Sequence, residues 1–325
     1  MTLLELIEAA ARQLTDAGVA FGHGTDNADD EAAWLTLWAL GLPLDTPLTA
    51  DDVEGDISDE LALSLGGAQA VPPQGQRAIT ANEQARVQNL LVERIATRKP
   101  AAYLTKEAWL QGVSFYIDER AIVPRSFIAE LLADGSIDPW LSDQTERVLD
   151  LCTGNGSLAV LAAMVYPDVQ VDGVDLSPDA LAVAQINVER HQLHERISLR
   201  LSDGLNALQA PPLGVYDLIL CNPPYVNAAS MAALPAEYRA EPELALAGGD
   251  DGMDFVRTLL RDAPAHLSDQ AVLVLEIGNE RAHFERAFAD LEVVWLPTSA
   301  GDDQVLLLTR AALQTWLAAD STPTP

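Results

Sequence analysis

A proline-rich segment, Asn222-Pro223-Pro224-Tyr225, follows the apolar run 218–221 and carries the clearest chemical signal in the chain. Side-chain amide and aromatic amine nitrogens are poor nucleophiles, because their lone pairs are delocalised. The side-chain oxygen of Asn222 and the backbone carbonyl of Pro223 can accept both N–H groups of such a nitrogen, which aims its lone pair at an electrophile. The prolines stiffen the loop, and Tyr225 offers a flat face for stacking. The segment predicts a site that alkylates a planar nitrogen.

Three aspartates stand where three successive strands are expected to end: Asp150, Asp175 and Asp203. Parallel sheets bind ligands at the carboxyl ends of their strands. Asp175 is placed to accept hydrogen bonds from two ribose hydroxyls, or alternatively to cap the next helix together with Ser177. Asp203, followed by Gly204, is an ordinary turn when it is taken alone.

The first of these strands is followed by Asp150-Leu-Cys-Thr-Gly154-Asn-Gly156-Ser157. Gly154 and Gly156 permit a sharp turn and let a ligand approach the backbone closely. The segment is not the three-glycine fingerprint of dinucleotide-binding folds. It indicates either a different cofactor loop or a tight strand-to-helix turn.

The elements that must position these residues follow from the apolar pattern. Helical spacing predicts an all-helical first hundred residues, with helices over 3–14, 28–40, about 51–65 and 81–97. Two strands, 109–117 and 121–123, are expected to form a hairpin around residues 118–120, and a helix near 126–133 follows.

From Arg147 onward, short apolar strands alternate with helices, which is typical of a doubly wound parallel sheet. The expected strands are 148–151, 169–174, 197–201, 216–221, 271–277, 292–296 and 304–309. The expected helices are 158–165, 178–191, 252–266 and 281–289. The last connection, 297–303, is too short for a helical crossover, so the last two strands should be antiparallel. The fold class is therefore α/β, a mostly parallel seven-stranded sheet with an antiparallel last hairpin, which is the architecture of class I methyltransferases.

The charge and composition of the chain indicate which classes of binding partner and which cellular compartment to expect. The 325 residues carry a net charge of −30, and residues 1–66 hold 14 acidic residues against one basic residue. An acidic surface repels phosphate backbones and favours basic partners, including basic proteins, although a salt-adapted source would produce the same composition. Two cysteines, no basic leader and no apolar run of about 20 residues predict a cytoplasmic protein without a membrane segment. His191 and His194 lack a third ligand, so no metal is expected.

Five segments together resemble the bacterial protein-glutamine methyltransferases, over roughly residues 80–310. That family has a helical N-terminal domain, a hairpin linker and a class I domain that uses S-adenosylmethionine and releases S-adenosylhomocysteine. The resemblance implies domain boundaries of 1–100, 101–125 and 126–311, with a tail over 312–325. The segments are Lys99-Pro-Ala-Ala-Tyr103-Leu, Val123-Pro-Arg125-Ser126-Phe-Ile-Ala-Glu130-Leu, Asp150-Leu-Cys-Thr-Gly154, Asn222-Pro-Pro-Tyr225 and Glu241-Pro-Glu-Leu-Ala-Leu-Ala-Gly248-Gly249-Asp-Asp-Gly252-Met-Asp254.

Two bacterial branches of that family differ in their substrate. One methylates the Gly-Gly-Gln glutamine of translation release factors, and the other a glutamine of large-subunit ribosomal protein L-three. The Val-Pro-Arg-Ser and Leu-Cys-Thr-Gly forms resemble the ribosomal-protein branch. The resemblance therefore implies a basic protein substrate, no direct readout of nucleic-acid sequence and no membrane partner.

The resemblance also implies roles for single residues. Asn222 and the Pro223 backbone would bind the glutamine amide, and Tyr225 would complete the catalytic set. Glu276 would either support this loop or be a buried structural carboxylate. The expected cofactor-binding residues are Arg125, Phe127, Asp150, Thr153, Gly154, Asn155, Gly156, Asp175, Leu176, Asp203, Gly204 and Asn222.

Two functions from other classes compete with this interpretation. Methylation of adenine N6 or guanine N2 in nucleic acids uses the same Asn-Pro-Pro-Tyr motif, but it needs a basic groove that this composition hardly supplies. A non-catalytic ribosome-assembly factor would keep the fold, but it would not need intact cofactor and acceptor motifs.

Overall fold

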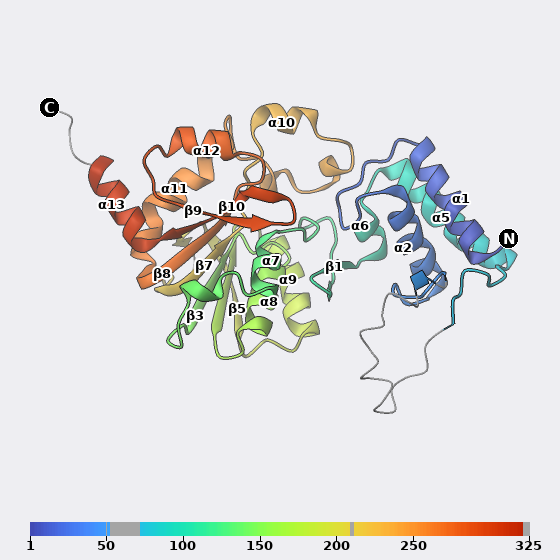
Figure 1. Cartoon of the computed structure of the whole chain (residues 1–325), viewed down its shortest axis with the longest axis horizontal. Coiled ribbons are helices and arrows are strands. Elements are labelled where there is room, and N and C mark those ends of the chain that lie inside the picture. The colour runs from blue at the N-terminus through green and yellow to red at the C-terminus, as the bar shows by residue number, and fades with distance from the viewer. Residues whose placement is uncertain (50, 53–71, 209–210, 321–325) are drawn as a thin grey trace. The chain divides into compact units, whose positions relative to one another are not determined.

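The computed structural model describes residues 1–49, 51–52, 72–208 and 211–320. Its contacts divide the chain into two units (Figure 1). The helical unit comprises Met1–Thr105 together with Ala236–Ala240, and the sheet unit comprises Lys106–Pro235 together with Glu241–Pro325. The helix expected over 51–65 lies outside the described residues apart from positions 51 and 52.

The helical unit is built from α1 (Leu3–Asp16), α2 (Ala28–Leu40), α5 (Ala81–Thr97) and the short α6 (Ala101–Thr105). Capping boxes begin α1 and α5, because Thr2 and Thr80 each exchange hydrogen bonds with a glutamate three residues later. Gly41 ends α2 in the left-handed conformation, with φ of 69°. The all-helical prediction for the described part of this unit is confirmed.

A buried ion network joins α2, α5 and the segment Ala236–Ala240 within the helical unit. The Arg94 side chain is fully buried, and its Nε donates to Glu31 Oε1 at 2.8 Å. Arg94 Nη1 lies 3.5 Å from Glu237 Oε1, which Arg98 also approaches at 3.4 Å. The His23 and Tyr238 rings pack beside this network, with centroids 4.2 Å apart. Residues 236–240, including the 3₁₀ turn η3 (Tyr238–Ala240), are thus held by helical-unit side chains.

The sheet unit contains an eight-stranded sheet in the order β6-β5-β4-β3-β7-β8-β10-β9. The central pairs are parallel, and β10 is antiparallel to both β8 and β9, as expected from the short last connection. The strands are β3 (Arg147–Leu151), β4 (Gln170–Asp175), β5 (Ile197–Asp203), β6 (Asn206–Ala207), β7 (Tyr216–Cys221), β8 (Leu267–Glu276), β9 (Val294–Thr298) and β10 (Gly301–Thr309).

Helices cover both faces of this sheet and form two apolar cores (Figure 1). The first core contains α7 (Ile128–Ala133), α8 (Ser157–Val165) and α9 (Pro178–Arg190). The second core contains α11 (Asp254–Asp262), α12 (Arg281–Ala287) and α13 (Arg310–Asp320). The remaining helical elements are α10 (Ala228–Ala233) and the 3₁₀ turns η2 (Asp138–Trp140), η4 (Glu243–Ala245) and η5 (Ala263–Ala265).

Two expectations about strands were wrong. The hairpin joins β1 (Ala108–Leu110) to β2 (Val113–Phe115), and its turn is Gln111-Gly112, both with positive φ. Residues 121–123 are in no strand, because the Val123 amide donates to the Glu241 side chain instead of to a neighbouring strand. The eighth strand, β6, arises because the turn at Gly204, with φ of 55°, reverses the chain against the end of β5.

None of the described helices combines the length and the apolar character that a membrane crossing requires. Among the same residues, no group of three or more His, Cys, Asp and Glu side chains is arranged to hold a metal ion.

Candidate active site

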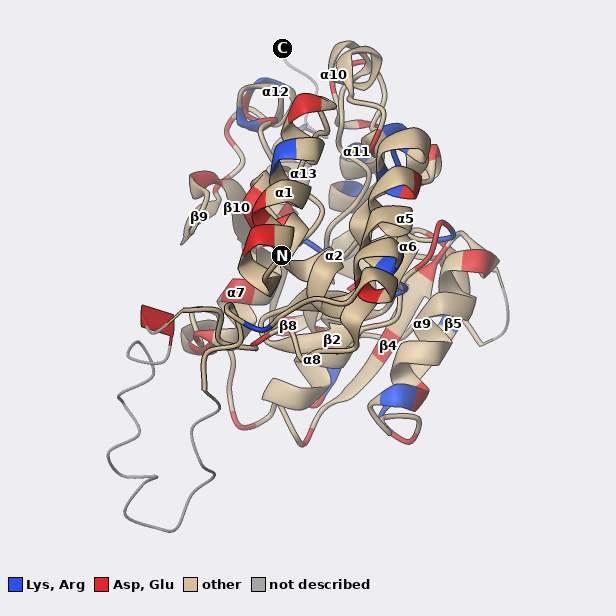
Figure 2. Ribbon diagram, turned by 90° about the vertical axis from the view of Figure 1, so that its right-hand side faces the viewer, with Lys and Arg blue, Asp and Glu red and all other residues tan. Residues whose placement is uncertain are grey.

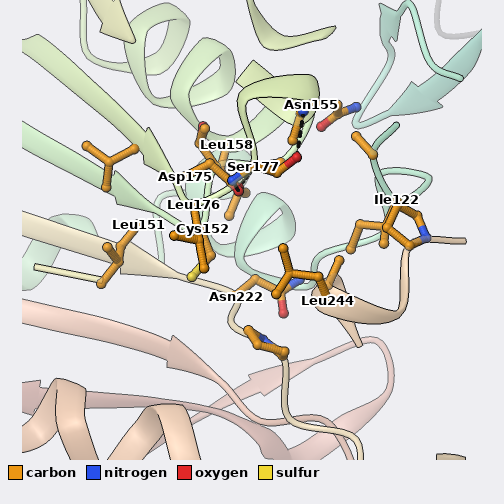
Figure 3. Close-up of a pocket in the computed structure, with 18 of the residues that line it drawn as sticks. Ile122, Leu151, Cys152, Asn155, Leu158, Asp175, Leu176, Ser177, Asn222 and Leu244 are labelled. Carbon is orange, nitrogen blue, oxygen red and sulfur yellow. Dashed lines mark hydrogen bonds between the residues drawn. The ribbon is translucent and has the colours of Figure 1, made fainter. Parts of the chain in front are cut away.

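A cavity that is open to solvent lies at the carboxyl ends of β3, β4, β5 and β7 within the sheet unit (Figure 3). Segments 120–126 and 242–245 form its other walls. The expected residues that line it are Arg125, Thr153, Gly154, Asn155, Asp175, Leu176, Asp203, Gly204 and Asn222. The expected residues outside the lining are Phe127, Asp150, Gly156, Pro223 and Tyr225.

The two glycines of the loop after β3 have different tasks. Gly154 has φ of 56°, and a Cβ there would meet no atom closer than 4.0 Å, so the position leaves space on the cavity side. Gly156 has φ of 80°, and a Cβ there would lie 3.0 Å from Ala184 Cβ. Gly154 therefore leaves room for a ligand, whereas Gly156 permits α8 and α9 to pack closely.

Asp150 lies behind this loop and not in the cavity wall. Its Oδ2 accepts hydrogen bonds from Thr153 Oγ1 and from the Ala159 amide, the latter at 2.9 Å. Its Oδ1 is buried without a hydrogen-bond partner among the described residues. Burial raises the pKa of the Asp150 carboxyl to about 7, although the hydrogen bonds from Thr153 and Ala159 lower it, and the nearby charge of Asp175 raises it further. Asp150 thus shapes the loop from behind, and its contact with a cofactor ammonium stays a prediction.

The pKa of Asp150 predicts a pH-dependent effect of Asp150→Asn on stability. An unfolded aspartate titrates near about 3.9, so between pH 4 and 7 the folded protein binds a proton that the unfolded chain has lost. The free energy of unfolding therefore falls as the pH rises through this range, and an asparagine lacks that contribution. Urea unfolding at pH 5 and pH 8 should show the wild type losing about 3 kcal/mol relative to the variant, because about two pH units separate pH 5 from the folded pKa, at about 1.4 kcal/mol for each unit. Because Glu276 titrates in both proteins, it cancels, and an equal difference at both pH values would contradict the prediction.

Asp175 ends β4 and does line the cavity. Its Oδ2 accepts from the Gly154 amide at 2.9 Å, and its Oδ1 accepts from the Ser177 amide at 2.8 Å. Burial raises the pKa of this carboxyl. Each carboxylate oxygen has a second lone pair, so Asp175 can also accept bonds from a ligand's hydroxyls. The capping interpretation and the ligand interpretation are therefore compatible.

The part of the cavity around Asp203 and Gly204 has more apolar lining than the sequence motifs indicate. The Leu176 side chain is exposed there. The Phe255 ring lies against Gly204, where an added Cβ would be 3.5 Å from Phe255 Cε2. Ile122 and Leu244 add apolar surface from outside the sheet (Figure 3). Sequence reasoning missed Ile122, Leu244 and Phe255, because an isolated apolar residue in a loop has no periodicity to mark it.

Asn187 on α9 is a further residue that the sequence did not indicate. Its buried side chain donates to the Asn155 carbonyl at 2.9 Å and to the Tyr116 carbonyl at 2.9 Å, and it accepts from the Tyr116 amide at 2.7 Å. One side chain therefore ties the glycine loop to the hairpin linker. Asn155 itself keeps an unpartnered, buried Nδ2 at the cavity (Figure 3), which is a donor available to a ligand.

Asn222 stands at the end of β7, facing the cavity beside Leu244 (Figure 3). Within the described residues, neither its side-chain amide nor the Pro223 carbonyl takes part in a hydrogen bond. A partly buried amide without a partner is costly unless a ligand satisfies it. The Asn222 side chain and the Pro223 carbonyl are thus available to accept the two N–H groups of a substrate nitrogen, as the Asn-Pro-Pro-Tyr motif requires.

Tyr225 does not line the cavity, but the chain packs tightly around it. A Cβ on Gly248 would lie 2.7 Å from Tyr225 Cα, and one on Gly252 would lie 2.2 Å from the Tyr225 carbonyl oxygen. The Val226 amide donates to the Leu246 carbonyl at 2.8 Å. The glycines of the segment 241–254 are therefore needed for close backbone approach to the loop after β7.

Charged groups from the linker are neutralised at the cavity. Arg125 forms a two-pronged ion pair with Glu241, with both N–O distances 2.7 Å. Arg120 pairs in the same way with Asp118 and holds the pKa of that carboxyl at about 2. Phe127 packs against the first apolar core, and only its amide approaches the site region, by donating to Glu276. Phe127 does not line the cavity, and its expected contact with the cofactor stays a prediction.

Cys152 directly follows β3, and Cys221 ends the neighbouring strand β7; both cysteines are free. Cys152 has a positive φ of 62° and lines the cavity, whereas Cys221 is buried. The contact with Cys221, followed by burial, raises the pKa of the Cys152 thiol.

The cavity fits S-adenosylmethionine by its own donor set. It offers an unpartnered amide donor on Asn155, a side-chain-free Gly154, two acidic strand ends and an apolar end around Phe255. The sheet order and this site define a class I S-adenosylmethionine-dependent methyltransferase. A family model described as "methyltransferase small domain" matches residues 136–237.

Comparison with curated proteins then defines the family. The chain is 51% identical over 316 residues to the ribosomal protein uL3 glutamine methyltransferase of Bordetella pertussis, covering 97% of both chains. It is 45% identical to the protein of that name from Neisseria gonorrhoeae, over 96% of this chain and 95% of the relative. The chain belongs to the ribosomal protein uL3 glutamine methyltransferase family. Among solved structures, a methyltransferase from Pyrococcus furiosus is similar with a TM-score of 0.42 and 17% identity, over 71% of this chain and 99% of that one.

Proposed function

We propose that this protein transfers a methyl group from S-adenosylmethionine to the side-chain amide nitrogen of a glutamine in ribosomal protein uL3. The observation that carries the proposal is the pair of acceptors without hydrogen-bond partners among the described residues, Asn222 and the Pro223 carbonyl, beside the cavity at the strand ends. The relatives that bear the uL3 name match almost the whole chain.

The mechanism assigns each step to residues of this chain. Asn222 Oδ1 and the Pro223 carbonyl accept the two N–H groups of the substrate amide and hold its lone pair toward the cavity. Both oxygens then stabilise the positive charge that develops on nitrogen. Asp175 and Asn155 would hold the cofactor, which would supply an electrophilic methyl group on sulfur. The alkylated nitrogen loses its proton to solvent, because that proton is acidic and needs no strong base.

The charges at the cavity favour a protein over a nucleic acid as substrate. Arg120 and Arg125 are the arginines in its lining, and both are engaged by carboxylates. Binding of a phosphate backbone depends on available Lys and Arg side chains. The acceptor selected at this site is therefore an amide on a polypeptide, and the release-factor glutamine remains the second candidate.

A parallel labelling assay tests the proposal. Full-length protein is incubated with radiolabelled S-adenosylmethionine and, separately, with ribosomal protein uL3, a translation release factor and duplex DNA. We expect label on uL3 at a glutamine, identified by peptide mass spectrometry. Label on the release factor alone, or on DNA, would overturn the assignment.

Acidic residues on the helical unit should help to attract a basic substrate (Figure 2). Asp26, Asp29 and Asp51 are exposed, whereas Glu31 is buried in the Arg94 network and must be left intact. Changing these three aspartates to asparagine should raise the apparent KM for uL3 by at least about threefold at low salt, and the effect should shrink as salt rises.

The matched control changes three exposed aspartates of the sheet unit to asparagine: Asp143, Asp168 and Asp290. It has the same net charge but leaves the helical unit untouched. An equal rise in KM in both triple variants would assign the effect to total charge, and no rise in either would show that the acidity does not recruit the substrate.

A further inference from the structure

The turn after β8, residues 276–280, contacts the loop after β7, residues 222–227, which we call the acceptor loop. Glu276 Oε1 lies 3.4 Å from the Tyr225 hydroxyl, and Asn227 Nδ2 donates to Glu280 Oε1 at 2.6 Å. The two contacts flank Val226 on either side. The acceptor loop is therefore held at two points just after the Asn222-Pro223 pair.

Gly278 lies between those two contacts and meets the Tyr225 ring. An added Cβ would lie 2.5 Å from Tyr225 Cε2 and 3.1 Å from its hydroxyl oxygen. The backbone there has φ of 52°, a region that favours glycine. It cannot easily retreat, because the neighbouring Ile277 is fully buried and its amide donates to the Gln304 carbonyl at 2.9 Å. The ring thus occupies the space that any side chain at position 278 would fill.

The two glutamates of the turn are themselves fixed. Glu276 is only 2% exposed, and its Oε2 accepts from Ser126 Oγ at 2.6 Å and from the Phe127 amide at 2.9 Å. Glu280 is also buried and pairs with His283 on α12. Neither carboxylate is free to follow the acceptor loop if that loop moves, so the turn is a fixed reference for Tyr225 and Asn227.

We propose that the 276–280 turn is the positioning platform of the acceptor loop: Gly278 accepts the Tyr225 ring, while Glu276 and Glu280 fix the positions of Tyr225 and Asn227. The inference rests on the proposed amide methylation and adds residues that act through Asn222 and Pro223 without touching substrate. A displacement of about 1 Å at a reacting group can cost about 100-fold in rate. Close packing of Gly278 against the Tyr225 ring would prevent such a displacement of the acceptor loop.

The first test is Gly278→Ala, with activity and cofactor affinity measured separately. We expect kcat to fall at least about tenfold, because the Tyr225 ring must move, while the Kd for S-adenosylmethionine, measured by calorimetry, stays within about threefold of wild type. Gly41→Ala is the control, since Gly41 has φ of 69° but no atom within 4 Å of an added Cβ. The control should keep wild-type kcat even if its stability falls. A Gly278→Ala enzyme with wild-type kcat would overturn the proposal, and so would one that loses cofactor affinity as much as kcat.

A second pair of variants applies if Gly278→Ala does not fold. Glu280→Ala removes the acceptor for Asn227, whereas Glu280→Gln keeps an oxygen at that place. The alanine variant should lower kcat, and the glutamine variant should restore most of it without a change in KM for the protein substrate. Equal kcat in Glu280→Ala and wild type would contradict the platform.

Hydrogen exchange separates failure of this inference from failure of the proposed function. Amides of residues 225–228 should exchange faster in Gly278→Ala and Glu280→Ala than in wild type, whatever substrate the enzyme takes. Absence of uL3 methylation by the wild type would overturn the proposed function alone. Unchanged exchange in both variants would overturn the platform alone.

Discussion

Replacing Asn222 by alanine is expected to abolish methyl transfer while leaving S-adenosylmethionine binding nearly intact. The side-chain oxygen of Asn222 is one of two acceptors that orient the substrate amide, and loss of one such preorganised group costs about 100- to 1000-fold in kcat. The cofactor, in contrast, has Asp175, Asn155 and the Gly154 backbone available to it. Single-turnover labelling and calorimetry measure the two effects independently.

Two further variants sharpen this result. Asn222→Asp keeps an oxygen acceptor at the same place and should retain more activity than Asn222→Ala. Asn82→Ala changes an exposed asparagine on α5 and should behave as wild type. If Asn222→Ala turned over substrate at the wild-type rate, the acceptor role would have to be given up.

Arg94→Met is expected to destabilise the helical unit by about 3–5 kcal/mol, because it leaves buried carboxylates without their cation. Glu31 and Glu237 are each 2% exposed, and Arg94 Nη2 also donates to the Ala20 carbonyl at 3.1 Å. Burial already raises the pKa of Glu31 despite the opposing effect of Arg94, so removing the arginine should drive this carboxyl toward its neutral form.

The effect of Arg94→Met is best followed by hydrogen exchange of α1, α2 and α5 in increasing urea, which reports on the helical unit by itself. The control is Arg12→Met in the same unit, because Arg12 pairs with Glu8 at 3.9 Å on the surface, where such pairs contribute about 0–1 kcal/mol. Arg94→Lys keeps the charge but loses the planar fork and should fall between the two. Equal stability of Arg94→Met and Arg12→Met would refute the role of the buried network.

Periodicity predicts the elements of this fold better than it predicts their irregular joints. The apolar strands of the sheet and the amphipathic helices follow from period-two and helical spacing, and β7 begins and ends at the expected residues. The hairpin was misplaced because its signal is a two-residue turn, Gln111-Gly112, and not an alternating run. Arg94 was missed as a core residue because a charged side chain on a helix is normally assigned to solvent.

In the candidate site, the residues predicted from strand ends line one cavity, whereas the sequence did not predict the long-range hydrogen bonds that hold the surrounding loops in place. Asp175, Asp203 and Asn222 line one cavity because parallel strands end at the same edge. Asn187 is 32 residues from the Asn155 carbonyl that it binds, and Glu276 is 150 residues from Ser126. Such pairings depend on the folded topology, and no local spacing encodes them.

The assignment of Ala236–Ala240 to the helical unit has a consequence for dissecting the protein. A truncated chain that begins at Lys106 would still carry Glu237 and Tyr238, but it would lack Arg94, Arg98 and His23. The N-terminal helices therefore cannot be deleted without removing the partners of Glu237 and Tyr238. A chimera that exchanges these helices with those of a relative must exchange residues 236–240 as well, because the two segments form one structural unit.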